Sequence, residues 1–541
     1  MDSPGRFRWL FDSEHGASNR LLPRWLFLRA LGLIYFSAFF PLLFQIRGLI
    51  GPDGILPAGD YLKAVAQSLG HVARLWYAPT LLWFSSGSHM LLALCWIGMA
   101  ASVLVVFNLW PRVTLLICFV CFLSFVSAAQ DFSGYQSDGM LLEAGFISLF
   151  LAPPGFRPGL GRLHPPSRAS LFLLLWEWFR IYFESGAVKL LSGDPQWRNF
   201  TAMDEYYQNG PLPTWIGWYV QHFPHWFHAG SVYATLALEL GLVWMFLLPR
   251  RWRIVCFFIV TPWQIMVILT ANYTFLNYLV LVLGVLLLDD KFCQRFLPFL
   301  KSGHSEPLAG AGPPGRVEEP AVPASAAMVH EPPFRSTYNA IKLSLASAML
   351  LWIFYTTTAE MLWMFWRSLP LPSQPIVALE PFRIANQYGL FAVMTRGRYE
   401  IEFQGSNDGQ NWTAYPFGYK PQALDQPPRI YAPYQPRFDW NLWFASLGSW
   451  REYPIVLNTE VRLLSGDKDV LRLFAGNPFP QSPPRQIRAV LWQYWFTSRS
   501  EKQLTGAWWR REMRGLYAPT LERQADGKIG AIEMPTVVAR D

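Results

Sequence analysis

The 541-residue chain has few charged residues for its length, since Asp, Glu, Lys and Arg make up only 15% of it. Soluble domains usually contain about 25% of these residues, so an ordinary cytosolic globular protein is excluded. The formal net charge is +8, but no lysine- or arginine-rich block concentrates it, and this argues against nucleic-acid binding. Hydrophobic residues make up 52% of the chain. Composition alone therefore indicates a membrane protein.

Cysteine is scarce, and the common catalytic motifs are absent from the sequence. Five cysteines are too few for a disulfide framework. Cys118 and Cys121 have the spacing of a redox pair, but continuous apolar sequence surrounds them, whereas a reactive thiolate needs a polarised and accessible setting. The sequence contains no Walker phosphate-binding loop, no H-E-x-x-H and no G-x-S-x-G. We expect no metal site and no cofactor, and a non-enzymatic role is favoured.

Long apolar runs fill the first half of the chain. A helix needs about 20 mostly apolar residues to cross a hydrocarbon core of about 30 Å. The segments that meet or approach this length lie near 25–45, 88–109, 112–129, 139–153, 170–190, 230–249, 253–270, 273–289 and 340–366. We therefore predict a polytopic α-helical membrane bundle of about nine spans, within a range of about eight to ten. The bundle is expected at 25–290, and the last transmembrane helix at 340–366.

The loops between these segments differ in their positive charge. One set contains about three times as many Lys and Arg residues as the other, and the richer set faces the cytoplasm in most membrane proteins. This places an N-terminal segment, 1–24, and a Gly/Pro/Ala-rich flexible linker, 291–339, in the cytoplasm. Residues 371–541 then lie outside the cytoplasm, which means the periplasm if the membrane is a bacterial inner membrane.

After the last apolar run, the sequence changes to strand and turn patterns. Residues 399–404 alternate between polar and apolar, as a half-buried strand does, and the turn residues 405–409 and a return strand at 410–415 follow. We predict that 371–541 is a soluble, mainly β domain, with helical segments near 438–447 and 485–498.

Charged residues inside the apolar segments are candidates for function because they are costly in lipid. Glu177, Arg180 and Glu184 are spaced three and four residues apart and so share one helix face, where Arg180 is able to bridge the two carboxylates. The full intramembrane polar cluster is predicted to contain Arg29, Glu143, Glu177, Arg180, Glu184 and Glu239. One interpretation is a set of structural ion pairs, and the other is a polar cavity that binds or processes a ligand.

Lys189 ends the fifth apolar segment and has two interpretations of its own. It either extends to the membrane interface, as lysines at helix ends usually do, or is desolvated with a lowered pKa and serves as a base. In the second case the candidate catalytic residues are Lys189, Glu143 and Glu184.

Several segments together resemble the lipase maturation factor family. They are 134–146 (GYQSDGMLLEAGF), 183–199 (FESGAVKLLSGDPQWRN), 271–277 (ANYTFLN), 386–394 (NQYGLFAVM), 405–412 (GSNDGQNW) and 436–445 (PRFDWNLWFA). The resemblance spans about 25–500 and implies a polytopic protein, known in animals from the endoplasmic reticulum, that helps secreted lipases to fold and assemble. It singles out a motif loop of Tyr135, Gln136, Asp138, Gly193, Asp194, Trp197 and Arg198.

The transmembrane half also resembles the fold of vitamin K-dependent γ-glutamyl carboxylase, known as HTTM. In that enzyme a similar segment carries a catalytic lysine, which Lys189 within Ser185-Gly-Ala-Val-Lys189 matches. The resemblance implies, as the alternative function, an intramembrane carboxylase-like enzyme that acts on a lipid-accessible substrate.

The favoured function is that of a membrane-bound maturation factor for secreted or envelope client proteins, lipases in the family. Its partners are these clients and membrane lipids, and its oligomeric state stays open. Exposed aromatic residues often anchor interfaces, so the candidate client-binding residues are Trp412, Tyr415, Trp440 and Trp443, for which a place in the domain core is the other interpretation.

Overall fold

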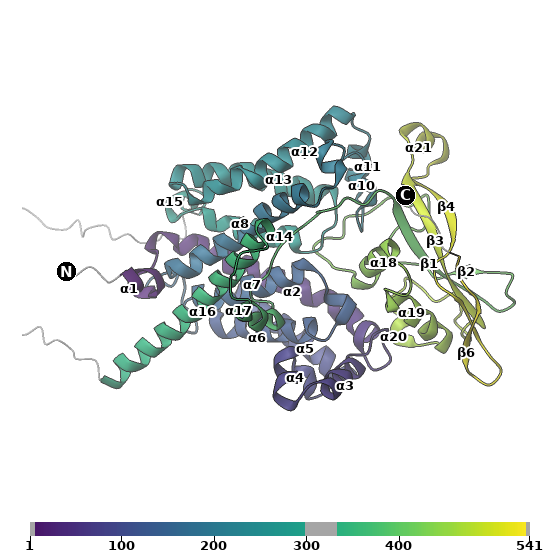
Figure 1. Cartoon of the computed structure of the whole chain (residues 1–541), viewed down its shortest axis with the longest axis horizontal. Coiled ribbons are helices and arrows are strands. Elements are labelled where there is room, and N and C mark those ends of the chain that lie inside the picture. Colours follow the sequence, from purple (N-terminus) through teal and green to yellow (C-terminus); the bar gives the residue numbers. More distant parts are fainter. Residues whose placement is uncertain (1–5, 298–332, 537–541) are drawn as a thin grey trace, which may run out of the picture.

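The computed structural model describes residues 6–297 and 333–536. Most of the predicted linker at 291–339 lies outside the described residues, and its two ends belong to α15 (Asp290–Cys293) and α16 (Pro333–Phe365). A helical body forms one end of the described chain and a β-sheet the other (Figure 1).

Helices are present at all the predicted apolar segments. They are α2 (Leu21–Ile50), α5 (Ser88–Val106), α6 (Pro111–Val126), α7 (Gln136–Leu151), α8 (Arg168–Leu191), α12 (His225–Leu240), α13 (Arg250–Thr270), α14 (Leu276–Gly284) and α16. Five described helical segments are long and apolar enough to cross a membrane: 18–50, 88–106, 225–247, 250–270 and 337–365. Helices α6, α7 and α14 are shorter, and α8 carries three charged residues in its middle. Membrane-spanning helices are thus confirmed, whereas the count of about nine spans stays a prediction.

Shorter helices cover the helical body. They are α1 (Arg6–Phe11), α3 (Ala58–Ser68), α4 (His71–Tyr77), α9 (Pro195–Arg198), α10 (Tyr206–Asn209) and α11 (Trp215–Gln221). Side chains cap the N-termini of two of these helices. Asp194 accepts a hydrogen bond from the Gln196 N–H in α9, and Thr214 accepts one from the Gly217 N–H in α11. Figure 1 shows α1 at the end of the molecule opposite the sheet, whereas α10 and α11 lie next to the sheet.

The C-terminal part contains one antiparallel sheet. Its strands are β1 (Arg398–Ser406), β2 (Thr413–Ala414), β3 (Gln486–Phe496), β4 (Trp509–Leu516), β5 (Thr520–Arg523) and β6 (Ile529–Glu533). The order is β2-β1-β3-β5-β6, and β4 also pairs with β3. The predicted hairpin is confirmed: β1 and β2 pair across a turn in which Asp408 accepts backbone hydrogen bonds from Gln410 and Asn411.

Helices cover this sheet, so the domain is less purely β than its sequence indicates. They are α18 (Arg437–Leu447), α19 (Pro454–Ser465) and α20 (Lys468–Leu471). Helix α21 (Arg499–Thr505) connects β3 to β4, whereas α17 (Gln374–Leu379) lies beside α16 in the helical body (Figure 1). The predicted helix near 438–447 is confirmed as α18. The predicted helix near 485–498 is wrong, because this segment is β3. Its Val, Trp, Tyr and Phe residues favour strands, and Ile487, Ala489, Val490 and Leu491 are fully or almost fully buried.

The hydrophobic core continues from the helical body into the C-terminal part. Buried apolar residues of α2, α7 and α8 belong to the same cluster as those of α18, α19 and β3. Helices α18, α19 and α20 lie between the sheet and the helical body (Figure 1). The sheet is therefore packed against the membrane helices through a shared apolar core.

Candidate functional site

After α16, the chain turns back along this helix before it reaches the sheet. The Trp352 indole N–H donates to the Pro375 carbonyl at 2.8 Å, and the Tyr355 hydroxyl donates to the Pro372 carbonyl at 2.8 Å. Both donors lie ten or more residues before the end of α16. The chain then leaves α17 as an irregular segment, and we call residues 386–394 the strap.

The strap lies along the second half of α8 and the loop that follows it. The Tyr388 N–H donates to Glu184 Oε2 at 2.6 Å, and the Leu390 N–H donates to Ser185 Oγ at 3.2 Å. Further along, the Met394 N–H donates to Asp194 Oδ2 at 2.7 Å. Irregular backbone at membrane depth is tolerated only where protein groups or water satisfy it, and these side chains supply the hydrogen bonds.

Glu143 and Arg180 hold the start of the strap. Both are fully buried and form an ion pair. Glu143 Oε2 accepts hydrogen bonds from the Asn386 N–H at 3.0 Å and from the Tyr388 hydroxyl at 2.8 Å. Arg180 donates to the Asn386 carbonyl at 2.5 Å. Arg180 was expected to be able to bridge Glu177 and Glu184, but the carboxylate with which it forms a hydrogen bond, Glu143, comes from α7.

Four of the six residues predicted as one polar cluster, Glu143, Glu177, Arg180 and Glu184, lie close enough to interact electrostatically, and Arg29 and Glu239 make other contacts. Glu143, Arg180 and Glu184 surround the strap. Arg29 instead donates to the Trp25 carbonyl of its own helix at 3.2 Å, and its guanidinium carbon lies 4.6 Å from the Trp25 ring centre. Glu177 is buried, and its carboxylate oxygens form no hydrogen bond with the described residues.

Lys189 does not extend to the membrane interface, because its side chain is 2% exposed and paired with Glu239. Its Nζ lies 2.8 and 3.0 Å from the two carboxylate oxygens of Glu239 and also donates to the Ser185 carbonyl at 3.3 Å. This pair lines a cavity of about 70 Å³, together with Trp197, Tyr206 and other residues. Lys189 is thus bonded to a carboxylate other than Glu143 and Glu184, so the arrangement gives no support to the catalytic trio.

The first part of the predicted motif loop joins α7 to the C-terminal part. Asp138 and Arg437 are fully buried and form two hydrogen bonds of 2.7 and 2.8 Å. Gln136 Oε1 accepts a hydrogen bond from the Gly389 N–H of the strap at 3.0 Å. The Tyr135 ring packs edge-on against that of Trp440 in α18. These side chains therefore serve as a docking site within the chain.

The second part of the motif loop holds the far end of the strap. Asp194 bonds to the strap through one oxygen and caps α9 through the other. The Trp197 indole N–H donates to the Phe391 carbonyl at 3.0 Å. Gly193 has a φ of +77°, which glycine adopts without strain, whereas Arg198 is exposed.

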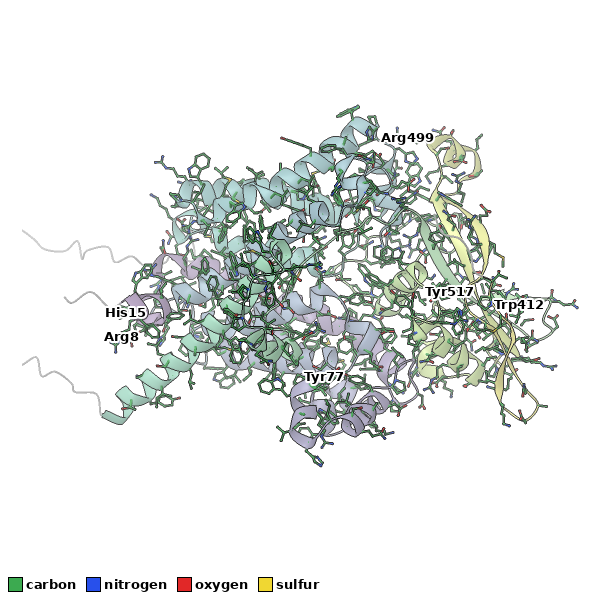
Figure 2. All side chains as sticks on the ribbon, viewed as in Figure 1. Arg8, His15, Tyr77, Trp412, Arg499 and Tyr517 are labelled. Carbon is green, nitrogen blue, oxygen red and sulfur yellow. The ribbon has the colours of Figure 1, made fainter. Side chains whose placement is uncertain are left out.

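The four candidate client-binding residues do not form an exposed surface. Tyr415, Trp440 and Trp443 are 1%, 7% and 8% exposed, so they are core residues and unavailable to a client. Trp412 is half-buried, with the Arg488 guanidinium carbon 4.1 Å from its ring centre. Figure 2 shows Trp412 on the side of the sheet away from the helical body.

The sequence arguments missed the roles of Asn272 and Arg398. Asn272 Oδ1 accepts hydrogen bonds from the Tyr431 and Ala432 N–H groups at 2.7 and 3.0 Å, and its amide donates to the Arg429 carbonyl at 2.8 Å. Arg398 in β1 donates to the Gln208 carbonyl of α10, at 2.9 Å, and to the carbonyls of Gly210 and Pro211, which follow this helix. Asn272 lies within 271–277, a segment used above for the family resemblance, and Arg398 had no comparable signal.

Comparison with known proteins assigns the family. A model described as the lipase maturation factor transmembrane domain matches residues 22–295, and a model of the lipase maturation factor C-terminal domain matches residues 384–519. The chain belongs to the lipase maturation factor family. The C-terminal match starts two residues before the strap, so the strap counts as part of that domain in the family.

The curated relatives match along most of their length. Lipase maturation factor 2 of Homo sapiens is 32% identical, with 92% of this chain and 82% of the relative covered. Lipase maturation factor 2 of Gallus gallus is 31% identical, with 92% and 81% covered. Lipase maturation factor 1 of Bos taurus is 30% identical, with 93% and 89% covered. No solved structure gives a significant match to the chain.

Proposed function

We propose that this protein is a membrane-embedded maturation factor that assists the folding and assembly of lipase-like client proteins. The observation that carries the proposal is its match to lipase maturation factors over nine-tenths of the chain, including both domains. The helical body holds the protein in the membrane of the endoplasmic reticulum, or in a bacterial inner membrane. The sheet and its covering helices receive the client on the non-cytoplasmic side.

The placement of the two ends of the molecule supports this orientation. Helix α1 and the start of α16 lie at one end, and the sheet lies at the other (Figure 1). An odd number of spans, such as the nine predicted, puts the N-terminal segment and the sheet on opposite sides of the membrane. Accessibility of single cysteines to an impermeant reagent tests this: Arg8→Cys is expected to be protected in sealed vesicles with the lumenal side out, and Arg499→Cys to react.

A hollow of about 510 Å³ in the C-terminal part is the proposed place of client contact. Residues of the loop 415–431 line it together with sheet residues such as Arg511 and Trp509. The loop contributes Pro416, Pro421, Pro427 and Pro428. Because proline restricts the backbone before binding, such a loop loses little conformational entropy when a client docks.

The function is tested by lipase secretion from cells that lack their own maturation factor. Expression of the full chain is expected to restore the secreted activity of a dimeric lipase. Arg429→Glu, in the hollow, is expected to lower the rescue and the amount of lipase that co-purifies from membranes. Arg499→Glu, on the exposed face of α21, is the matched control and is expected to leave both unchanged. Failure of the wild-type chain to restore any lipase, at normal abundance, would refute the proposal.

A further inference from the structure

A second cavity lies where the end of α2 meets the C-terminal part. It has a volume of about 320 Å³. Phe44 and Gln45 of α2 line it from one side, and Tyr434, Asp439 and Arg472 from the other. Gln45 fixes this junction, because its amide donates to the Gln435 carbonyl at 3.0 Å.

The cavity presents one charge of each sign. Asp439 is 2% exposed, and its Oδ1 accepts hydrogen bonds from the backbone N–H groups of Tyr419 and Lys420 at 3.2 and 3.1 Å. Both of these bonds involve the same carboxylate oxygen. The Arg472 side chain is 62% exposed and has an exposed pairing with Asp469 at 3.1 Å. A buried carboxylate is stabilised by a cationic hydrogen-bond donor, while the exposed guanidinium is able to bind an anion such as phosphate.

An apolar stripe on α2 leads to this cavity. Leu33, Phe40 and Phe44 are 59%, 38% and 59% exposed. The Phe40 ring packs against Phe44 at 5.2 Å and against Tyr434 at 6.4 Å between ring centres. Helix α2 is a candidate membrane span, so this stripe faces lipid.

The length of α2 places the cavity at the polar boundary of the membrane. Its 30 residues extend about 45 Å at about 1.5 Å per residue, which exceeds a hydrocarbon core of about 30 Å. Phe44 lies near the end that meets the C-terminal part, so the carboxylate and guanidinium are at the depth of lipid headgroups. A soluble small molecule would contact the cavity but not the adjoining apolar stripe, whereas a lipid contacts both.

We propose that this cavity binds the headgroup of a phospholipid with a primary ammonium group, namely phosphatidylethanolamine. The ammonium donates a hydrogen bond to Asp439, the phosphate pairs with Arg472, and the acyl chains lie along Phe40 and Phe44. An anionic lipid without an amine places no cation beside the buried carboxylate. A choline headgroup carries the positive charge but has no N–H to donate.

The test is native mass spectrometry of the full chain from nanodiscs with equal parts of phosphatidylethanolamine, phosphatidylcholine and phosphatidylglycerol. The wild type is expected to retain one phosphatidylethanolamine in preference to the other two. Asp439→Asn keeps the acceptor for the two backbone N–H groups but removes the charge, and is expected to lower retention about tenfold, the loss of one charge-assisted hydrogen bond. Arg472→Ala is expected to lower the retention of all three lipids.

The matched control is Lys468→Ala, which removes an exposed cation from α20, the short helix that ends just before Arg472, outside the cavity lining. It is expected to leave lipid retention unchanged. Equal retention of the three lipids by the wild type would overturn the proposal, as would an unchanged preference for phosphatidylethanolamine in Asp439→Asn together with unchanged lipid retention in Arg472→Ala. Arg472 is exposed, so its variant reports on the site even if Asp439→Asn folds poorly.

Discussion

Asp138 at the start of α7 and Arg437 at the start of α18 form a fully buried ion pair with two hydrogen bonds, of 2.7 and 2.8 Å. The two residues are 299 positions apart in the sequence. Arg437 also donates to the Phe132 carbonyl at 2.7 Å, and its guanidinium carbon lies 4.8 Å from the Phe125 ring centre. This pair fixes the C-terminal part against the membrane helices.

Arg437→Met is expected to destabilise the protein by about 3–5 kcal/mol, because it leaves the Asp138 carboxylate buried without its partner. The measurement is the thermal unfolding midpoint in detergent. The control is Lys63→Ala, which removes the exposed pair between Lys63 and Asp60 and is expected to change stability by less than about 0.5 kcal/mol. Equal midpoints for the two variants would contradict a fixing role for Arg437.

Glu184→Leu is expected to loosen the strap, since the Tyr388 N–H loses its acceptor. An unsatisfied buried donor costs about 1–3 kcal/mol. Glu184→Gln keeps an oxygen acceptor in nearly the same shape and is the matched control. Hydrogen exchange of residues 386–394 is expected to speed up in Glu184→Leu far more than in Glu184→Gln. Similar exchange rates in both would show that charge rather than acceptor geometry matters at this position.

Lys189 and Glu239 are expected to behave as a structural pair. Lys189→Met and Glu239→Leu each leave one buried charge unpaired and are expected to reduce abundance and to lower the free energy of unfolding by about 3–5 kcal/mol. The double variant removes both charges and is expected to recover most of the stability. Lipase maturation by a stable double variant is the measurement that distinguishes a structural ion pair from a catalytic lysine base. Lost maturation in a fully stable double variant would revive the lysine-base hypothesis.

Stability is expected to depend on pH through Asp439. The pKa of this carboxyl is raised from 3.8 to about 6, mainly by burial and to a smaller extent by the charge of Glu400, against the lowering effect of Lys420 and of the backbone N–H group of Tyr419. The folded state therefore binds a proton more tightly than the unfolded state between about pH 4 and 6. The free energy of unfolding rises as the pH falls through this range, by at most about 3 kcal/mol from this group.

Asp439→Asn is the variant that isolates this effect. It is expected to unfold at a higher temperature than the wild type at pH 7.5, and the difference is expected to shrink at pH 5, in detergent without added phosphatidylethanolamine. A difference that stays constant between the two pH values would show that Asp439 has an ordinary pKa in the folded protein.

Local patterns in the sequence predicted much of the fold. Apolar runs located the membrane helices because a span needs a continuous apolar surface. The alternation at 399–404 and the turn at 405–409 located the hairpin of β1 and β2 because each depends only on neighbouring residues. The helix expected near 485–498 failed, since strand pairing on both sides of β3 determines its structure.

Only part of the candidate site could be predicted from the sequence. Charge within apolar segments drew attention to Glu143, Arg180, Glu184 and Lys189, since each is costly in lipid. The partners could not be found in this way. Tyr388 is 204 residues from Glu184, and Glu239 is 50 residues from Lys189, and neither spacing follows a helix or strand period.

The sequence by itself determined that this protein lies in a membrane, in which segments its long apolar helices lie, and which family it resembles. Only the tertiary structure decided that the strap returns among the helices and that the buried charges satisfy its backbone. A buried apolar helix can be predicted from a run of apolar residues, because its burial depends on the composition of that one element. Hydrogen bonds and ion pairs are directional and short, so the residue that meets each polar group is decided only when distant segments pack together.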